Sequence, residues 1–192
     1  MPNHHSTDPW THVTSLHGIP ADELIAVLQK SIRRGLLENA LLAAREMYVT
    51  SAELEEQLWL RLCVISCEDT GDGSYFEPVL LNSLYQMHQR LDRSYGDRWL
   101  FAVHAVRFLV ERPKDRTTDE LANLTLHKLN SGQLPEIPDW ALDVHTRRGQ
   151  EMGRTVEDFW NIHSHVENER PNRDQKYLEQ IKALLAAGEW KA

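Results

Sequence analysis

Cysteine is scarce in this 192-residue sequence, which contains only Cys63 and Cys67. Two cysteines are too few for a disulfide framework. They lie four positions apart in a segment predicted to be helical, a poor spacing for a disulfide, whose Cβ atoms lie about 3.8 Å apart. We expect both side chains to be buried as small hydrophobic groups.

Long apolar runs are also absent. No run approaches the ~20 residues that a membrane-spanning helix needs, and the mean hydropathy is −0.51. The opening residues, MPNHHSTDPW, lack the apolar segment of a secretory signal. We therefore expect a cytoplasmic protein with no membrane partner.

Motifs for catalysis and phosphate binding are missing as well. The sequence has no G-x-x-x-x-G-K-[ST] loop, and its 71–73 segment is an acidic turn that would repel phosphate and lacks EF-hand spacing. Ser66 has no nucleophile-elbow context, and an apolar helix would keep the thiols of Cys63 and Cys67 protonated. The sequence therefore favours a non-catalytic protein, with no catalytic residue and no cofactor predicted, and an enzyme stays open as the alternative.

The balance of charge and hydrophobicity is that of a globular protein. Lys and Arg number 21 against 29 Asp and Glu, giving a net charge of −8, and hydrophobic residues make up 41%. This composition fits one domain, or one domain with an appendage. The acidic balance argues against a protein that coats nucleic acid, although a local basic patch stays open.

Apolar residues recur at helical spacing through the first two thirds of the chain. No alternating segment is long enough to predict a strand. Two pairs, Thr50 with Glu53 and Thr117 with Glu120, have the spacing of capping boxes. We predict an all-α fold of about six helices packed as antiparallel pairs. The predicted helices are 21–34, 36–48, 50–67, 78–91, 99–110 and 117–129.

The character of the chain changes at a linker that contains Gly132, Pro135 and Pro138. We expect an N-terminal segment (1–20), a helical domain (21–132) and a helical C-terminal extension (133–192). Within the extension we predict a partly helical stretch broken at Gly149 and Gly153. Two further helices are predicted there, at 155–166 and 176–187.

Three arginines in the extension are candidate ligands for an anion or for DNA. Glycines around them would let the backbone approach an anion, and the guanidinium fork suits phosphate. Asp139, Asp143 and Glu151 neutralise the same stretch, so salt bridges explain the arginines equally well. The candidates are Arg147, Arg148 and Arg154.

The ten histidines raise the question of a metal site. There is no H-E-x-x-H and no Cys/His quartet, so we predict no metal site. A site assembled from distant residues stays open as an alternative; its members would be Asp143, His145, His163 and His165.

Two other charged groups are expected to lie in solvent. Lys30, Arg33 and Arg34 fit a solvated helix end. The second group, on one predicted helix, fits a solvated helix face; it comprises Glu53, Glu55 and Glu56.

Several short blocks resemble a known family. Three of these blocks lie between Glu23 and Gly71, in the order ELIAVLQKSIRRG, ALLAAREM and LWLRLCVISCEDTG. A fourth block follows them, AVHAVRFLVERPKD. They are similar to K-S-x-R-G, A-L-x-x-L-A-R-M, S-E-D-I-G and A-x-x-x-L-x-x-x-P-K-S in the C-terminal helical region of clamp-loader-like AAA+ ATPases. The family is that of replication-associated recombination protein A, which includes the Werner-helicase-interacting ATPase. The matching residues are Lys30, Ser31, Arg33 and Gly35; Ala40, Leu41, Ala44, Arg45 and Met47; and Ser66, Glu68, Asp69 and Gly71.

The resemblance covers roughly residues 12–130 and has clear departures. Cys67 is inserted in the third block, Thr70 replaces its Ile, and Asp115 stands at the Ser position of the fourth. The AAA+ motor does not occur in this sequence, and the chain from Ile137 onward does not match the family.

The resemblance implies a helical collar that assembles as a homo-oligomer, a tetramer in that family. It also implies a separate AAA+ motor protein as a partner and a role in DNA replication or repair, with DNA itself a further candidate partner. Leu54, Leu58 and Trp59 are candidate interface residues, because Trp is favoured at interfaces. The alternative hypothesis is a metal- or phosphate-dependent enzyme or ligand-binding module centred on 137–165.

Overall fold

The computed structural model describes residues 8–70 and 75–190. Within those ranges every regular element is a helix, which confirms the predicted all-α fold. The chain divides into two compact units, Met1–Ser131 and Gly132–Ala192. None of the helices in the described ranges has the length and apolarity needed to cross a membrane. The predicted acidic turn at 71–73 lies outside the described residues.

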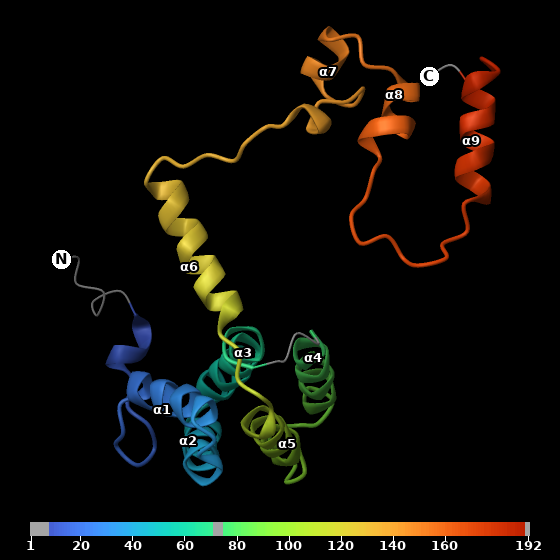
Figure 1. Cartoon of the computed structure of the whole chain (residues 1–192). Helices are drawn as coiled ribbons and strands as arrows, with labels where there is room; N and C mark the ends of the chain where they lie inside the picture. Colours follow the sequence, from blue (N-terminus) through green and yellow to red (C-terminus); the bar gives the residue numbers. More distant parts are fainter. Residues whose placement is uncertain (1–7, 71–74, 191–192) are drawn as a thin grey trace. The chain divides into compact units, whose positions relative to one another are not determined.

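In its described residues, 8–70 and 75–131, the first unit contains six α-helices after a short 3₁₀ turn, η2 (Pro9–His12) (Figure 1). Consecutive helices from α1 to α5 contact one another, and α5 also contacts α1 and α2. The helices are α1 (Ala21–Arg33), α2 (Leu37–Thr50), α3 (Ala52–Glu68), α4 (Glu77–His88), α5 (Arg98–Glu111) and α6 (Thr117–Asn130).

Helices α1 to α5 build the hydrophobic core of this unit. On α1 the buried side chains follow the helical period, with Leu24, Leu28 and Ile32 at four-residue intervals. The α1 segment is followed by Gly35, whose φ of +75° allows the chain to turn into α2. Trp10, from the N-terminal segment, packs against the same core.

Both predicted capping boxes are wrong. The cap of α3 is Ser51, whose hydroxyl accepts a hydrogen bond from the Leu54 amide, because the helix begins one residue later than the sequence suggested. The Thr50 hydroxyl instead donates to the Glu46 carbonyl at the end of α2. At α6, Thr117 already lies inside the helix, so its amide is bound by the carboxylate of Asp115.

The cysteines are not buried as expected. Cys63 is half-buried and Cys67 is exposed, and both are unbridged. They share the side of α3 that carries Leu60, whose exposure is 57%. Burial raises the pKa of the Cys63 thiol, so this thiol stays protonated at neutral pH.

The second unit consists of short elements and one longer helix. In chain order they are η3 (Asp139–Ala141), α7 (Arg147–Glu151), α8 (Val156–Asp158), the π turn η4 (Phe159–His163) and α9 (Lys176–Ala186). The predicted helix at 155–166 is therefore only one short turn followed by a π turn, opened by a capping box between Thr155 and Asp158.

Gly149 does not break a helix, contrary to the prediction. It is buried inside α7, where a Cβ would lie 1.8 Å from the carbonyl oxygen of Asp143. Glycine is needed there because of this close approach of two backbone segments. Gly153, at φ +77°, follows the end of α7.

Candidate functional site

The three arginines of the second unit have separate surroundings. Arg154 binds Asp139 with Nη2 at 2.6 and 2.7 Å from the two carboxylate oxygens. Arg147 faces Glu151 at 3.5 Å on the exposed side of α7, where Arg148 is exposed as well. Arg147 and Arg154 thus each have a carboxylate of their own, and these contacts give no shared anion site.

The histidines of the same unit also have separate partners. His145 Nδ1 lies 2.9 Å from Asp143 Oδ2, and His163 Nδ1 lies 2.9 Å from the Trp140 carbonyl oxygen. His165 faces Glu167 at 3.5 Å. Hydrogen bonding to His145 lowers the pKa of Asp143. Among residues 8–70 and 75–190, no three His, Cys, Asp or Glu side chains come together as metal ligands, so the alternative metal site is not assembled there.

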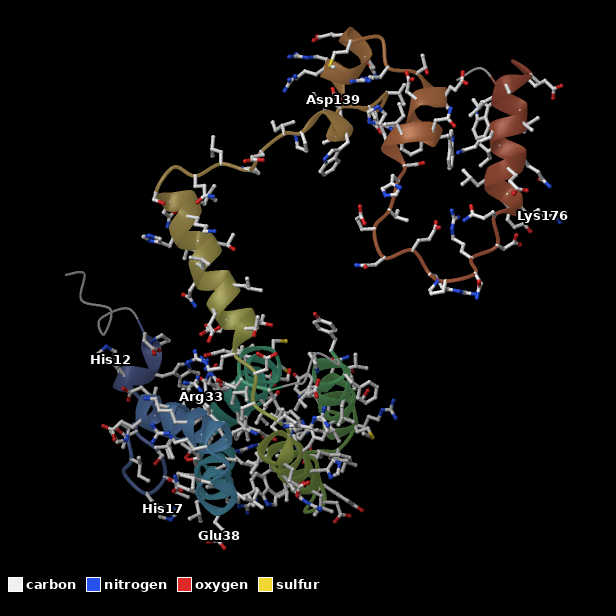
Figure 2. All side chains as sticks on the ribbon, viewed as in Figure 1. His12, His17, Arg33, Glu38, Asp139 and Lys176 are labelled. Carbon is white, nitrogen blue, oxygen red and sulfur yellow. The ribbon has the colours of Figure 1, made fainter. Side chains whose placement is uncertain are left out.

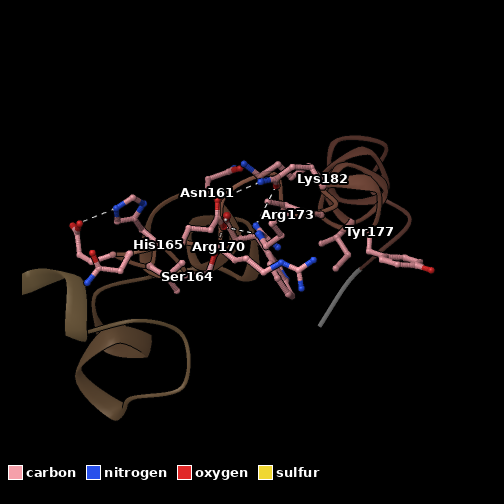
Figure 3. A pocket seen from close by; sticks show the side chains of 15 residues that line it. Asn161, Ser164, His165, Arg170, Arg173, Tyr177 and Lys182 are labelled. Atoms are coloured by element: carbon pink, nitrogen blue, oxygen red, sulfur yellow. Dashed lines mark hydrogen bonds and ion pairs between the residues drawn. The ribbon is translucent and has the colours of Figure 1, made fainter. Parts of the chain in front are cut away.

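A groove of about 790 Å³ lies between the 160–170 segment and α9 (Figure 3). Its charged lining residues are of both signs. Arg173 pairs with Glu169 at 2.5 Å, and His165 with Glu167. Arg170 and Lys182 also line the groove, and within the described residues neither forms an ion pair, so the lining carries three cationic side chains against two carboxylates.

Leu54, Leu58 and Trp59 lie in the core of the first unit, with exposures of 0%, 0% and 1%. Their spacing on α3 directs them between the other helices, and Trp59 packs against Tyr85 and His88. The prediction that they form an interface surface is therefore wrong, because a residue that fills the core cannot also meet a partner.

Glu55 is the centre of a buried polar cluster, not part of a solvated face. Its exposure is 2%, and its two oxygens bind His88, Arg98 and Arg93 at 2.6, 2.8 and 2.8 Å. Burial by itself would raise the pKa of Glu55, but hydrogen bonds from these three groups outweigh it and lower the pKa to about 2. Glu55 is four positions before Trp59, so the two side chains lie on the same side of α3. This spacing could have predicted from the sequence that Glu55 is buried.

The Glu55 cluster has a structural role. His88 is fully buried, so no solute can reach the imidazole in this structure. The cluster joins α3, α4 and α5 through one carboxylate. It holds the core in register and offers no site for a substrate.

A second buried carboxylate, Asp69, fixes the start of α6. Arg33 binds Asp69 Oδ1 at 2.5 Å, and Arg116, just before α6, lies 3.5 Å from the same atom. The Asp115 amide donates to the Asp69 carbonyl oxygen at 3.3 Å. Arg33 is thus part of a contact between α1 and α3, which corrects the prediction that it belongs to a solvated helix end.

Helix α6 carries leucines that the described residues of its own unit leave about half exposed. None of its residues is buried. Figure 2 shows the side chains of α6 (yellow) standing clear of the α1–α5 core. The exposed leucines, with their exposures, are Leu121 (58%), Leu124 (49%), Leu126 (59%) and Leu129 (54%).

Comparison with known proteins adds no assignment: no protein-family model matches the chain, and no curated protein matches it either.

Proposed function

We propose that this chain is a non-catalytic helical assembly domain that forms homo-oligomers through the apolar face of α6. The observation that carries the proposal is that Leu121, Leu124 and Leu129 share one side of α6 and remain about half exposed or more. Exposed apolar side chains gathered on one element mark sites of protein association.

The arrangement of the first unit supports this role for α6. Helices α1 to α5 complete a core without any α6 side chain, so α6 is not required to fill it. The contacts of Asp69 with Arg33 and Arg116 nevertheless fix the start of α6 to α1 and α3. A helix that is anchored at one end and apolar along its length is suited to receive a partner helix.

The resemblance to the collar of clamp-loader-like AAA+ ATPases supports the same proposal. In that family the corresponding region mediates assembly, and the ATP chemistry lies in a separate motor. We extend the proposal on this basis to an AAA+ motor protein as partner and to a task in DNA replication or repair. The structural argument for self-assembly does not depend on this extension.

The test is the molar mass of the protein in solution, measured by light scattering over a range of concentrations. We expect the wild-type mass to rise above 22.3 kDa with concentration. Replacing Leu121 and Leu129 together by Ala should lower the mass toward the monomer without loss of helicity, because neither side chain is buried and Ala favours helix.

The matched control is Leu60→Ala on α3, which removes a leucine of similar exposure, 57%, from another helix. This variant should assemble as the wild type does. Two results would contradict the proposal. The first is a wild-type protein that is monomeric at every concentration, and the second is a Leu60→Ala variant that loses assembly as fully as the α6 variant.

A further inference from the structure

We infer that the partner of the α6 face is α6 of a second copy, paired antiparallel about a two-fold axis close to Leu124. This inference rests on the proposed function and adds the identity and the orientation of the partner. It is argued from the order of charges and leucines along α6.

The first observation is a row of residues spaced four apart on α6, namely Glu120, Leu124 and Lys128. Residues at this spacing lie one above the other on the same side of a helix. Glu120 lies near the start of α6 and Lys128 near its end, and both side chains are exposed. Neither has an ion-pair partner within the described part of the chain, so both are available to a second molecule.

The second observation is the symmetry of this row. A two-fold axis at Leu124 places Glu120 of each copy opposite Lys128 of the other, because the two residues lie equally far from Leu124. A two-fold interface repeats each contact, so two pairs of opposite charge form. Parallel pairing would place Glu120 against Glu120 and Lys128 against Lys128.

The neighbouring row is also symmetric in its apolar residues, about Thr125, one position from the centre of the charged row. Leu121, Thr125 and Leu129 are also spaced four apart, with a leucine at each end. In the antiparallel arrangement the Leu121 end of one helix meets the Leu129 end of the other. Leucine would meet leucine at the ends of this row in either orientation, so the apolar contacts are compatible with the antiparallel pair and the charge contacts select it.

The size of the contact predicts a weak complex. Fourteen residues make a helix about 21 Å long. A pair of such helices buries less than the roughly 1,200–2,000 Å² of a stable interface. We therefore expect association that depends on concentration and weakens with salt, since it includes pairs of opposite charge. The same two-fold contact can occur within a tetramer of dihedral symmetry.

The orientation can be tested on the wild-type protein by zero-length carbodiimide cross-linking, with equal amounts of light and ¹⁵N-labelled chains. Within one chain, Glu120 and Lys128 are separated by about 12 Å along the helix, too far for direct coupling. In the antiparallel pair they meet. We expect mass spectrometry to find a Glu120–Lys128 cross-link that joins a light and a heavy chain.

A charge exchange provides a second test that does not depend on cross-linking. Glu120→Lys or Lys128→Glu alone should weaken association about tenfold, because each creates two like-charge contacts. The double variant E120K/K128E should recover most of the loss. Circular dichroism of each variant checks that α6 stays helical, since the exchange opposes the helix dipole.

The outcomes separate this inference from the proposed function. The assembly function stands if the protein assembles with concentration and the Leu121/Leu129 double variant abolishes this assembly. The antiparallel pair is overturned if, in the same protein, the inter-chain cross-link is missing and the single charge variants assemble as the wild type does. Assembly only upon addition of a different protein would also overturn it. A monomer at all concentrations would overturn both.

Discussion

The Nε2 atom of His88 lies 2.6 Å from Oε1 of Glu55, and both side chains are buried at the junction of α3 and α4. Arg98 on α5 reaches the same carboxylate oxygen at 2.8 Å. One carboxylate thus holds three helices in register. Because His88 and Arg98 are largely shielded from water, which could otherwise replace the carboxylate as their partner, the loss of this carboxylate has a large cost.

Glu55→Gln should reduce the free energy of unfolding by about 3–5 kcal/mol, because it leaves Arg98 partly buried without a counter-charge. Urea unfolding followed by circular dichroism measures the change. The control is Glu111→Gln, whose ion pair with Arg107 is exposed and should contribute about 0–1 kcal/mol. Equal losses in the two variants would contradict a structural role for the Glu55 cluster.

The depressed pKa of Glu55 predicts a specific acid dependence. The pKa is about 2 in the folded protein and has its ordinary value of 4.5 in the unfolded chain, so the stabilisation is present above about pH 4.5 and is lost as the pH falls toward 2. Unfolding free energies measured between pH 6 and pH 2 should fall more steeply for the wild type than for Glu55→Gln. Parallel curves would show that other carboxylates determine the acid response.

Ser51→Ala should destabilise the protein by about 1 kcal/mol, since it removes the hydrogen bond that the Leu54 amide donates to the Ser51 hydroxyl. Ser51→Thr keeps a capping hydroxyl and should retain most of the stability. Thermal or urea unfolding distinguishes the two. A Thr variant as unstable as the Ala variant would mean that the cap hydrogen bond is not the source of the loss.

Gly149→Ala should disrupt the turn that contains α7, because the new Cβ would lie 1.8 Å from the Asp143 carbonyl oxygen. We expect a local cost of about 1–3 kcal/mol, seen as faster amide hydrogen exchange in residues 143–154. Gly96→Ala is the control, since a Cβ at Gly96 meets nothing within 4 Å. Unchanged exchange in Gly149→Ala would show that the turn can open without cost.

The helices of the first unit could be predicted because each has a local signal. The apolar period of α1 and the Gly35 stop both lie within a few residues of the element that they define. The caps were less predictable. Thr50 and Ser51 are adjacent hydroxyl residues, and only the position where the chain leaves the extended conformation, at Ser51, decides which one caps α3.

The candidate sites were less predictable because they depend on contacts distant in sequence. The burial of Glu55 depends on His88, Arg93 and Arg98, which lie 33 to 43 positions away. The leucines of α6 show the converse. Their pattern is that of any amphipathic helix, and they are exposed because α1 to α5 already complete the core. Local periodicity shows that a helix has an apolar face but not what covers that face.

The absence of buried residues in α6 has an evolutionary consequence. Under the assembly that we propose, mutations on this helix can alter the choice of partner without changing the side chains of the five-helix core, since no α6 side chain belongs to that core. Mutations at Glu55 or Asp69 have the opposite character, because both carboxylates are buried in contacts between helices. If α6 mediates the proposed assembly, selection for binding and selection for folding act on different residues of the same unit, and each can proceed without opposing the other.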